Sequence, residues 1–314
     1  MPSPDRHSAH AQPLVVCAGL AVIDYVFAIE RPTWGAKQRA TAFRAVVGGC
    51  AANGTVTVAR LGARSRLVAP LGGPAEVDTV GDHILGWLKR EHVDCASVVR
   101  MPGVTSPLSS ILIDRAGERS IVTYRDPHFL PSPPSDPDAL IADAAAVLVD
   151  DHLPDFVLPV AAAARRRGLP VVVDLEKHNP ETEKLRALCT HLVFSADAAR
   201  ATAGTDKLEL AVRRIARQTQ GFVAATNGGD DTLFVEDGEP QRLPTFKVKA
   251  VDTLAAGDVF HAAFTLALAE RRSERDALRF ASAVAALKCT RFGGIAGAPT
   301  RAEVENFLKE HAAA

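Results

Sequence analysis

The sequence predicts an α/β fold: a three-layer α/β/α core with a mainly parallel sheet, plus a small second β-sheet. Short, continuous apolar runs alternate with helical segments over the second half of the chain, which is typical of parallel strands buried between helices. In addition, two β-type runs flank a turn near residues 108–124, a hairpin pattern. Because a purely alternating core contains no hairpin, we expect this pair of strands to belong to a separate sheet.

Composition and charge narrow the possible functions. The 314 residues are 47% hydrophobic and 23% charged, as in an ordinary globular protein. The formal net charge of −1 gives no electrostatic reason to expect nucleic acid or a membrane surface as a partner. The five cysteines are scattered and include no CxxC pair, which predicts reduced thiols in a cytoplasmic protein and argues against a zinc motif. They are Cys17, Cys50, Cys95, Cys189 and Cys289.

The chain is predicted to begin with a disordered tail over residues 1–13, followed by one domain over residues 14–314. The apolar run Leu14–Ile23 is too short to cross a membrane and has no strongly basic flank, so we interpret its start as the first buried strand. The second sheet is predicted to be a discontinuous lid drawn from about residues 25–47 and 98–125, because both stretches contain short β-type runs and turns.

The remaining core elements follow from their apolar patterns and turn residues. We expect strands at Arg66–Gly72, Ala146–Asp150, Pro170–Asp174, His191–Ser195 and Gly221–Thr226, with antiparallel edge strands at Leu233–Val235 and Phe246–Lys249. Helices are expected at Asp78–Leu88, Leu158–Arg167, Glu274–Thr290 and Ala302–Leu308, and after Val251–Phe260.

Candidate binding residues occur where strands end and helices begin. Asp24 follows the first strand, and ligands of open α/β sheets bind outside the carboxyl ends of strands. Gly48 and Gly49 open a helix and allow a ligand to approach the backbone, and Asn53 is placed on the first turn of that helix. The alternatives are a capping aspartate and a tight strand-to-helix turn.

A second candidate site opens the helix whose apolar stripe begins at Phe260. Ala255, Ala256 and Gly257 have little or no side chain, so their N–H groups can approach an anion at the positive end of the helix dipole. Asp258 is then placed to accept a proton from a hydroxyl group. The alternative is an acidic residue that only caps the helix.

The early Gly48-Gly49…Asn53 block, the late Asp252-Thr253…Asp258…Phe260 block and the hairpin insert occur together in one α/β chain. In this combination the sequence resembles the ribokinase-like (PfkB) family of carbohydrate kinases over residues 14–308. Within that family, Val251–Phe264 and Leu278–Gly294 look closest to the branch of sulfofructose kinase and ketohexokinase.

The resemblance implies transfer of a phosphoryl group from ATP, with Mg²⁺, to a hydroxyl of a small sugar, a ketose or furanose-like. Asp258 matches the catalytic base, and Ala255, Ala256 and Gly257 match the anion hole. The family's contacts to sugar hydroxyls fall at Asp24, Gly48, Gly49 and Asn53 of this sequence. Its contacts to ATP fall at Thr226 and Gly228, in a strand-end turn, and at Ala285 and Cys289, on the helix beside the adenine.

Three departures from the family pattern are visible. Ala255 replaces a glycine, and the magnesium-associated N-x-x-E motif falls at Ser195–Ala198, where Asp197 is predicted to stand in as an ATP-site residue. The two positions that hold a sulfonate in sulfofructose kinases are Thr123 and His152 here, and Arg125 is the predicted replacement charge. The pattern names no metal ligands.

Two other functions are compatible with this pattern. One is a nucleoside kinase of the same fold, although two Trp and two Tyr offer few stacking partners for a base. The other is a catalytically silent relative that binds a sugar or nucleotide. The resemblance also implies a homodimer formed through the lid, because an exposed small sheet has edges to cover.

Overall fold

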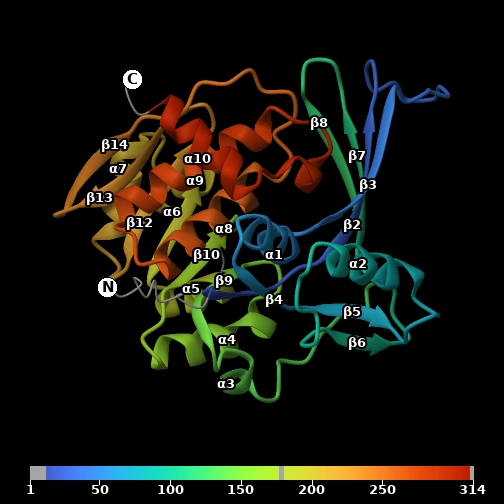
Figure 1. Ribbon diagram of the computed structural model, residues 1–314, viewed down its shortest axis with the longest axis horizontal. Coiled ribbons are helices and arrows are strands. Elements are labelled where there is room, and N and C mark those ends of the chain that lie inside the picture. The colour runs from blue at the N-terminus through green and yellow to red at the C-terminus, as the bar shows by residue number, and fades with distance from the viewer. Residues whose placement is uncertain (1–11, 177–179, 312–314) are drawn as a thin grey trace, which may run out of the picture.

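The computed structural model describes residues 12–176 and 180–311, and its central sheet follows the order β14-β13-β12-β11-β10-β9-β1-β4 (Figure 1). Six neighbouring strands, from β12 to β4 in this order, run parallel to one another. Strand β13 pairs antiparallel with β12 on one side and with β14 on the other. The bounds are β1 Leu14–Ala18, β4 Arg64–Val68, β9 Ala144–Asp150, β10 Val171–Leu175, β11 His191–Ser195, β12 Phe222–Asn227, β13 Asp230–Glu236 and β14 Glu239–Leu243. The predicted α/β class is therefore confirmed.

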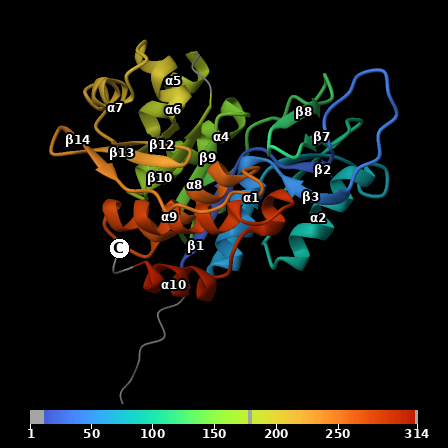
Figure 2. The same cartoon turned by 90° about the horizontal axis from the view of Figure 1, so that it is seen from above.

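Helices cover both faces of this sheet, which makes the three layers (Figure 2). One face carries α1 (Cys50–Arg60), α8 (Ala256–Ala269) and α9 (Glu274–Cys289), and α10 (Arg301–Glu310) packs on α9. Helix α2 (Thr79–Arg90) packs beside this layer, against strands outside the central sheet. The other face carries α4 (Pro154–Arg166), α5 (Pro180–Leu188), α6 (Ala196–Ala203) and α7 (Leu208–Ala216), and the short α3 (Pro137–Leu140) packs on α4. Alternate residues of β1 enter the two cores: Val15 and Cys17 face the first layer, and Val16 and Ala18 the second.

Helix α8 is the central helix of the first layer. Its residues from Val259 to Leu268 are all buried, because both α1 and α9 pack against it. A helix that is apolar on nearly every side is stable only inside a protein. The sheet and its helix neighbours therefore fix the position of the first turn of α8, where the predicted catalytic residues lie.

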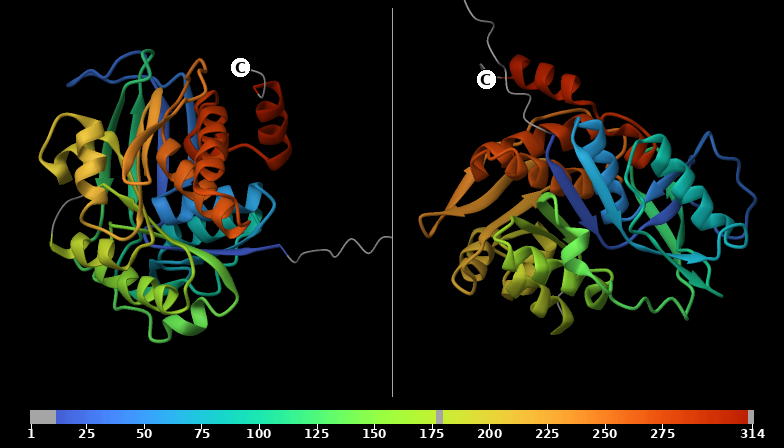
Figure 3. Two further views of the ribbon diagram at one scale, coloured as in Figure 1. Left: turned by 90° about the vertical axis from the view of Figure 1, so that its left-hand side faces the viewer. Right: turned by 60° about the horizontal axis from the view of Figure 1, so that its bottom comes forward.

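A second sheet stands beside the core with the order β3-β2-β7-β8 (Figures 1 and 3). It consists of β2 (Val22–Ala28), β3 (Ala42–Gly48), β7 (Leu108–Ile113) and β8 (Arg119–Tyr124). Strands β7 and β8 form the hairpin that the sequence predicts. A separate pair, β5 (Pro70–Gly73) and β6 (Val99–Pro102), forms a small parallel sheet, and the 3-10 turn η1 spans Gly294–Gly297.

Two predicted elements differ from the structure. The predicted strand Arg66–Gly72 is split between β4 and β5, which belong to different sheets; Pro70 lacks an N–H group and stands at the break. The run Phe246–Lys249 is not a strand, since the edge strand is Glu239–Leu243. Of the predicted tail, residues 1–11 lie outside the described part of the chain.

Candidate active site

The loop before α8 is held by one buried aspartate. The Oδ1 atom of Asp252 accepts the N–H of Leu254 at 2.7 Å, and its Oδ2 atom accepts the N–H groups of Gly293 and Gly294 at 2.8 and 2.9 Å. The ammonium group of Lys288, which is fully buried, donates to the backbone carbonyl of Asp252 at 2.8 Å. These contacts fix the loop to the end of α9 and so fix the direction in which α8 begins.

Backbone donors lie at the mouth of α8. Ala255 caps the helix in the left-handed conformation, with φ 62° and ψ 12°. The N–H of Ala256 donates to the carbonyl of Thr253 at 3.2 Å, whereas within residues 12–176 and 180–311 the N–H groups of Ala255 and Gly257 donate to no other group. Two free donors at the positive end of a helix are suited to binding an anion.

Replacing Ala255 with glycine is expected to raise the free energy of unfolding by about 0.5–1 kcal/mol. A non-glycine residue at positive φ is destabilised by roughly 1–2 kcal/mol, which the glycine variant recovers. Glycine also makes the unfolded chain more flexible, and this cancels part of the recovered stability. Urea unfolding measures the change. Ala256→Gly, in the neighbouring helical position, is the control and should destabilise; equal effects of the two substitutions would contradict the strain at Ala255.

The carboxylate of Asp258 meets the amide of Asn53, which lies 205 residues earlier in the chain. The Nδ2 atom of Asn53 donates to Oδ2 of Asp258 at 2.6 Å. Asn53 is buried on the first turn of α1, and its Oδ1 atom has no hydrogen-bond partner among the described residues. A buried acceptor without a donor is costly, so this oxygen is ready to accept a hydroxyl of a ligand.

Asp24 reaches the same place from β2 in the second sheet. A Cβ atom on Gly48 would lie 2.0 Å from Oδ2 of Asp24, and one on Gly49 would lie 2.5 Å from the carbonyl oxygen of Leu20. Gly49 also has φ 86°. The paired glycines are therefore required so that β3 can pass Asp24 and turn into α1 without a clash.

Burial raises the pKa of Asp24 to about 7; a hydrogen bond from Ser109 opposes this shift, and the charge of Asp258 adds to it. The folded protein therefore keeps this proton at pH values where the unfolded chain, with a pKa near 3.8, has released it. The resulting stability is present below about pH 4 and is lost as the pH rises to about 7.

Asp24→Asn is expected to reduce this pH dependence. Between pH 5 and 8, the wild-type protein should lose on the order of 2–4 kcal/mol more unfolding free energy than the variant does. Urea unfolding at the two pH values measures the difference. Asp155→Asn, at an exposed aspartate, should keep the wild-type dependence. An unchanged pH dependence in Asp24→Asn would show that Asp24 titrates normally.

Two residues behind Asp258 were not predicted from the sequence. His261, one turn further along α8, contacts two carbonyl oxygens: Nδ1 lies 2.8 Å from that of Gly257 and Nε2 lies 3.0 Å from that of Val193. Its ring also lies 3.5 Å from Asp174 at the end of β10. Although burial alone would lower it, these acceptors raise the pKa of His261. Both ring nitrogens then donate, and the imidazolium holds the first turn of α8 against the sheet.

An apolar cavity of about 280 Å³ lies on the other side of this turn, between the segment 244–250, α8 and α9. It is lined by residues that include six of the predicted ATP-site and anion-hole residues: Thr226, Gly228, Ala256, Gly257, Ala285 and Cys289. Its size and its mainly apolar wall suit a small ligand with a flat ring. Asp258 therefore contacts Asn53 of the predicted hydroxyl-binding group, while the two residues before it, Ala256 and Gly257, line this cavity.

Two predicted site residues lie apart from these groups. The carboxylate of Asp197 is 97% exposed and pairs with Arg200 at 3.0 Å, outside the residues that line the cavity. Arg125 is exposed directly after β8, and its Nη1 atom makes a long hydrogen bond of 3.5 Å to the carbonyl oxygen of His152.

The fold, the free donors at the start of α8 and the contact between Asp258 and Asn53 are those expected of a phosphotransferase of the carbohydrate kinase class. The model of the pfkB family carbohydrate kinases matches residues 12–301. This chain belongs to the pfkB family.

Three relatives show how far the similarity extends. A solved structure from Agrobacterium tumefaciens, which carries the provisional name ribokinase, is 35% identical with a TM-score of 0.91, covering 97% of this chain and 100% of that one. Bacillus subtilis ribokinase is 29% identical over 282 residues, 89% of this chain and 93% of the relative. The structure of Arabidopsis thaliana ribokinase with ribose and ATP is 26% identical with a TM-score of 0.80, covering 96% of this chain and 99% of that one.

Among the described helices, none combines the length and the apolar character that a membrane span needs.

Proposed function

We propose that this protein phosphorylates a hydroxyl group of a small, neutral, furanose-like sugar or ketose, with ATP as its Mg²⁺ complex. The position of Asp258 is the main support. Its carboxylate bonds to Asn53, beside Asp24, while the preceding residue, Gly257, lines the apolar cavity. A hydroxyl on one side and a nucleotide phosphate on the other would meet at the first turn of α8. The Arabidopsis ribokinase, which has been solved with ribose and ATP, supports the same pair of substrates.

In this proposal each group has one task. Asp258 accepts the proton of the attacking hydroxyl, and the oxygen of Asn53 together with Asp24 orients the sugar. The free N–H groups of Ala255 and Gly257 stabilise the charge on the phosphoryl group in transit. Thr226 and Gly228 meet the phosphates, Ala285 and Cys289 meet the adenine, and Mg²⁺ neutralises the phosphate charges. The second sheet, which supplies Asp24, acts as the lid that excludes water.

A neutral acceptor fits the local charges better than a sulfo-sugar does. Thr123, one of the two positions that would face a sulfonate, is exposed on β8, and the ring of His152, the other, lies 3.7 Å from the carboxylate of Glu176. Within the described residues, the guanidinium of Arg125 contacts the backbone carbonyl of His152 and forms no hydrogen bond or ion pair with Asp24, Asn53 or Asp258. The carboxylate of Asp258, which contacts Asn53, would repel an anionic substituent on a sugar bound there.

The test measures ADP release from Mg²⁺-ATP by the full chain with ribose, fructose, sulfofructose and adenosine as acceptors. We expect at least one neutral sugar to give a kcat/KM ten or more times that of sulfofructose and adenosine, with the phosphate ester identified by NMR. Preference for sulfofructose would assign the sulfofructose kinase branch, and preference for adenosine a nucleoside kinase. Saturable sugar binding without ADP release would assign a silent relative.

We further propose a homodimer that forms through the second sheet. Four large apolar side chains on its edge strands are about half exposed or more: Phe43 on β3, and Ile121, Val122 and Tyr124 on β8. Exposed edges of this kind favour pairing. Light scattering should give twice the mass of the chain, and Val122→Lys should shift the protein to the monomer; a monomeric wild-type mass contradicts the proposal.

A further inference from the structure

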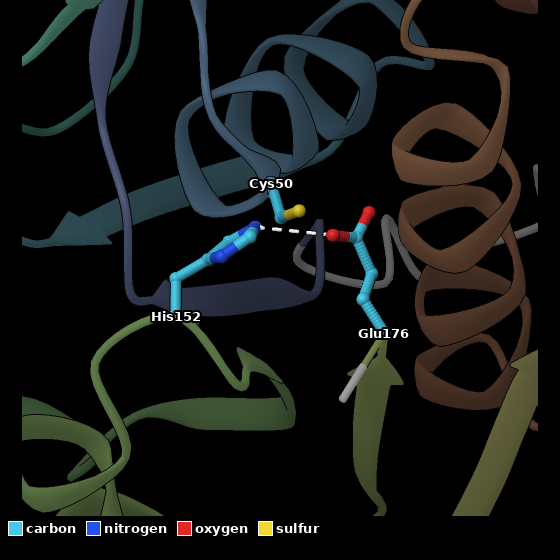
Figure 4. A group of neighbouring side chains, drawn as sticks. All are labelled: Cys50, His152 and Glu176. Carbon is cyan, nitrogen blue, oxygen red and sulfur yellow. Dashed lines mark ion pairs between the residues drawn. The ribbon is translucent and has the colours of Figure 1, made fainter. Parts of the chain in front are cut away.

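Three side chains of different chemistry converge on one point near the start of α1 (Figure 4). Cys50 is the first residue of α1, His152 follows β9, and Glu176 follows β10. The thiol sulfur, one ring nitrogen and one carboxylate oxygen all lie within 4.8 Å of one another. Nε2 of His152 and Oε2 of Glu176 are 3.7 Å apart.

These distances approach those of a tetrahedral metal site. Zn²⁺ binds sulfur at about 2.3 Å and nitrogen or oxygen at about 2.0–2.2 Å, which places two ligands of one ion roughly 3.3–3.6 Å apart. The His152–Glu176 distance is already close to this value. The side chain of Glu176 is 56% exposed, so it is free to move by the remaining ångström and also opens the site to solvent.

The ligand types select the kind of ion. A thiolate and an imidazole suit a borderline-soft ion such as Zn²⁺, whereas Mg²⁺ prefers oxygen ligands. Burial and the carboxylates of Asp258, Asp174, Asp150 and Glu176 raise the pKa of the Cys50 thiol. A cation that binds the sulfur must therefore displace the thiol proton to solvent, while the same carboxylates attract the cation.

We propose that Cys50, His152 and Glu176 bind a borderline-soft divalent cation, Zn²⁺ or its close substitute Co²⁺, and that the bound ion inhibits the enzyme. The ligand spacing along the chain, 50, 152 and 176, follows no zinc motif, so the site arises only from folding. It is distinct from the Mg²⁺ that accompanies ATP.

Inhibition follows from a second set of contacts. Cys50 also forms a group with Asp174 and Asp258 whose ligand atoms lie within 4.8 Å of one another. An ion bound to the sulfur therefore lies beside Asp258, the proposed base. Its positive charge makes the Asp258 carboxylate less basic, and the ion occupies space that the acceptor sugar needs. This half of the proposal rests on the proposed function; the binding half does not.

Titration of the full chain with Co²⁺ tests the binding. We expect a thiolate-to-metal charge-transfer band that Cys50→Ser abolishes, and affinities at least tenfold weaker in His152→Gln and Glu176→Gln. Cys95→Ser, at a half-buried thiol in the loop that follows α2, is the control and should keep the band. Persistence of the band in Cys50→Ser, or unchanged affinity in both other variants, overturns the site. This spectroscopic measurement requires no catalysis, so its result does not depend on which sugar, if any, the enzyme phosphorylates.

Inhibition is measured separately, with Zn²⁺ at a constant excess of Mg²⁺-ATP. We expect inhibition that an increasing acceptor concentration relieves, and a half-inhibitory Zn²⁺ concentration at least ten times higher in Cys50→Ser than in the wild type. Equal inhibition of the two proteins would overturn the inhibitory role while the binding result stands.

Discussion

Replacing Asp258 with asparagine is expected to lower kcat by about 10²–10⁴, the usual contribution of a positioned general base. The amide oxygen of the new side chain can still accept the 2.6 Å hydrogen bond of Asn53, so the first turn of α8 should keep its place. An amide has no useful basicity, and the proton of the attacking hydroxyl then lacks an acceptor. Steady-state kinetics with the best sugar measures the loss, and calorimetry should show ATP affinity within about threefold of the wild type.

A matched control separates chemistry from helix electrostatics. Asp276 lies in the first turn of α9, as Asp258 lies in the first turn of α8, and Asp276→Asn removes the same favourable charge from a helix start. That variant should keep kcat within about twofold. If Asp258→Asn retained more than a tenth of the wild-type kcat, Asp258 would not be the base.

Lys288→Met is expected to lower the free energy of unfolding more than any other substitution proposed for this protein. The Lys288 ammonium is fully buried and lies 3.6 Å from Oδ2 of Asp252, in addition to its hydrogen bond with the Asp252 carbonyl. Burial lowers the pKa of Lys288, and the charge of Asp252 opposes this shift. Removing Lys288 takes away the opposite charge and leaves the buried Asp252 carboxylate held only by backbone N–H groups, which costs about 3–5 kcal/mol. Thermal unfolding should show a fall in Tm on the order of 10 °C.

The same variant should also lose activity, because Asp252 anchors the loop that carries Ala255 and the start of α8. Lys309→Met, at an exposed lysine of α10, is the control and should change stability by less than about 0.5 kcal/mol. A double-mutant cycle with Asp252→Asn isolates the pair. Additive effects of the two substitutions would mean that the charges are not coupled and that Lys288 acts only through packing.

The parts of the site that depend on local sequence could be predicted. Ala255 to Asp258 form one continuous helix start, so the small residues and the apolar spacing along α8 were sufficient to predict where the helix begins, while the catalytic roles of these residues stay a prediction. The meeting of Asn53 with Asp258 is a long-range contact, and what pointed to it was the family resemblance together with the rule that ligand groups gather where strands end.

Other parts depend on contacts that no local pattern contains. His261 looks like a polar residue within an apolar helix until Asp174 and two carbonyl oxygens are placed around it. Asp197 occupies the first turn of α6, a favourable place in the sequence, yet that turn directs its carboxylate to solvent. The strand predicted at Arg66–Gly72 has a continuous apolar pattern, and only the pairing partners reveal that it serves two sheets.

Asp24 belongs to the second sheet, whereas Asn53 and Asp258 belong to helices of the core. A sugar that contacts all three residues therefore links the second sheet to the core. Its binding free energy opposes any motion that separates the two, and at a free sugar concentration of one hundred times Kd this stabilisation is about 2.7 kcal/mol. Proteolysis of the β2–β3 connection should consequently slow as the acceptor is added, so the preferred sugar can be recognised by protection alone, before any phosphate is transferred.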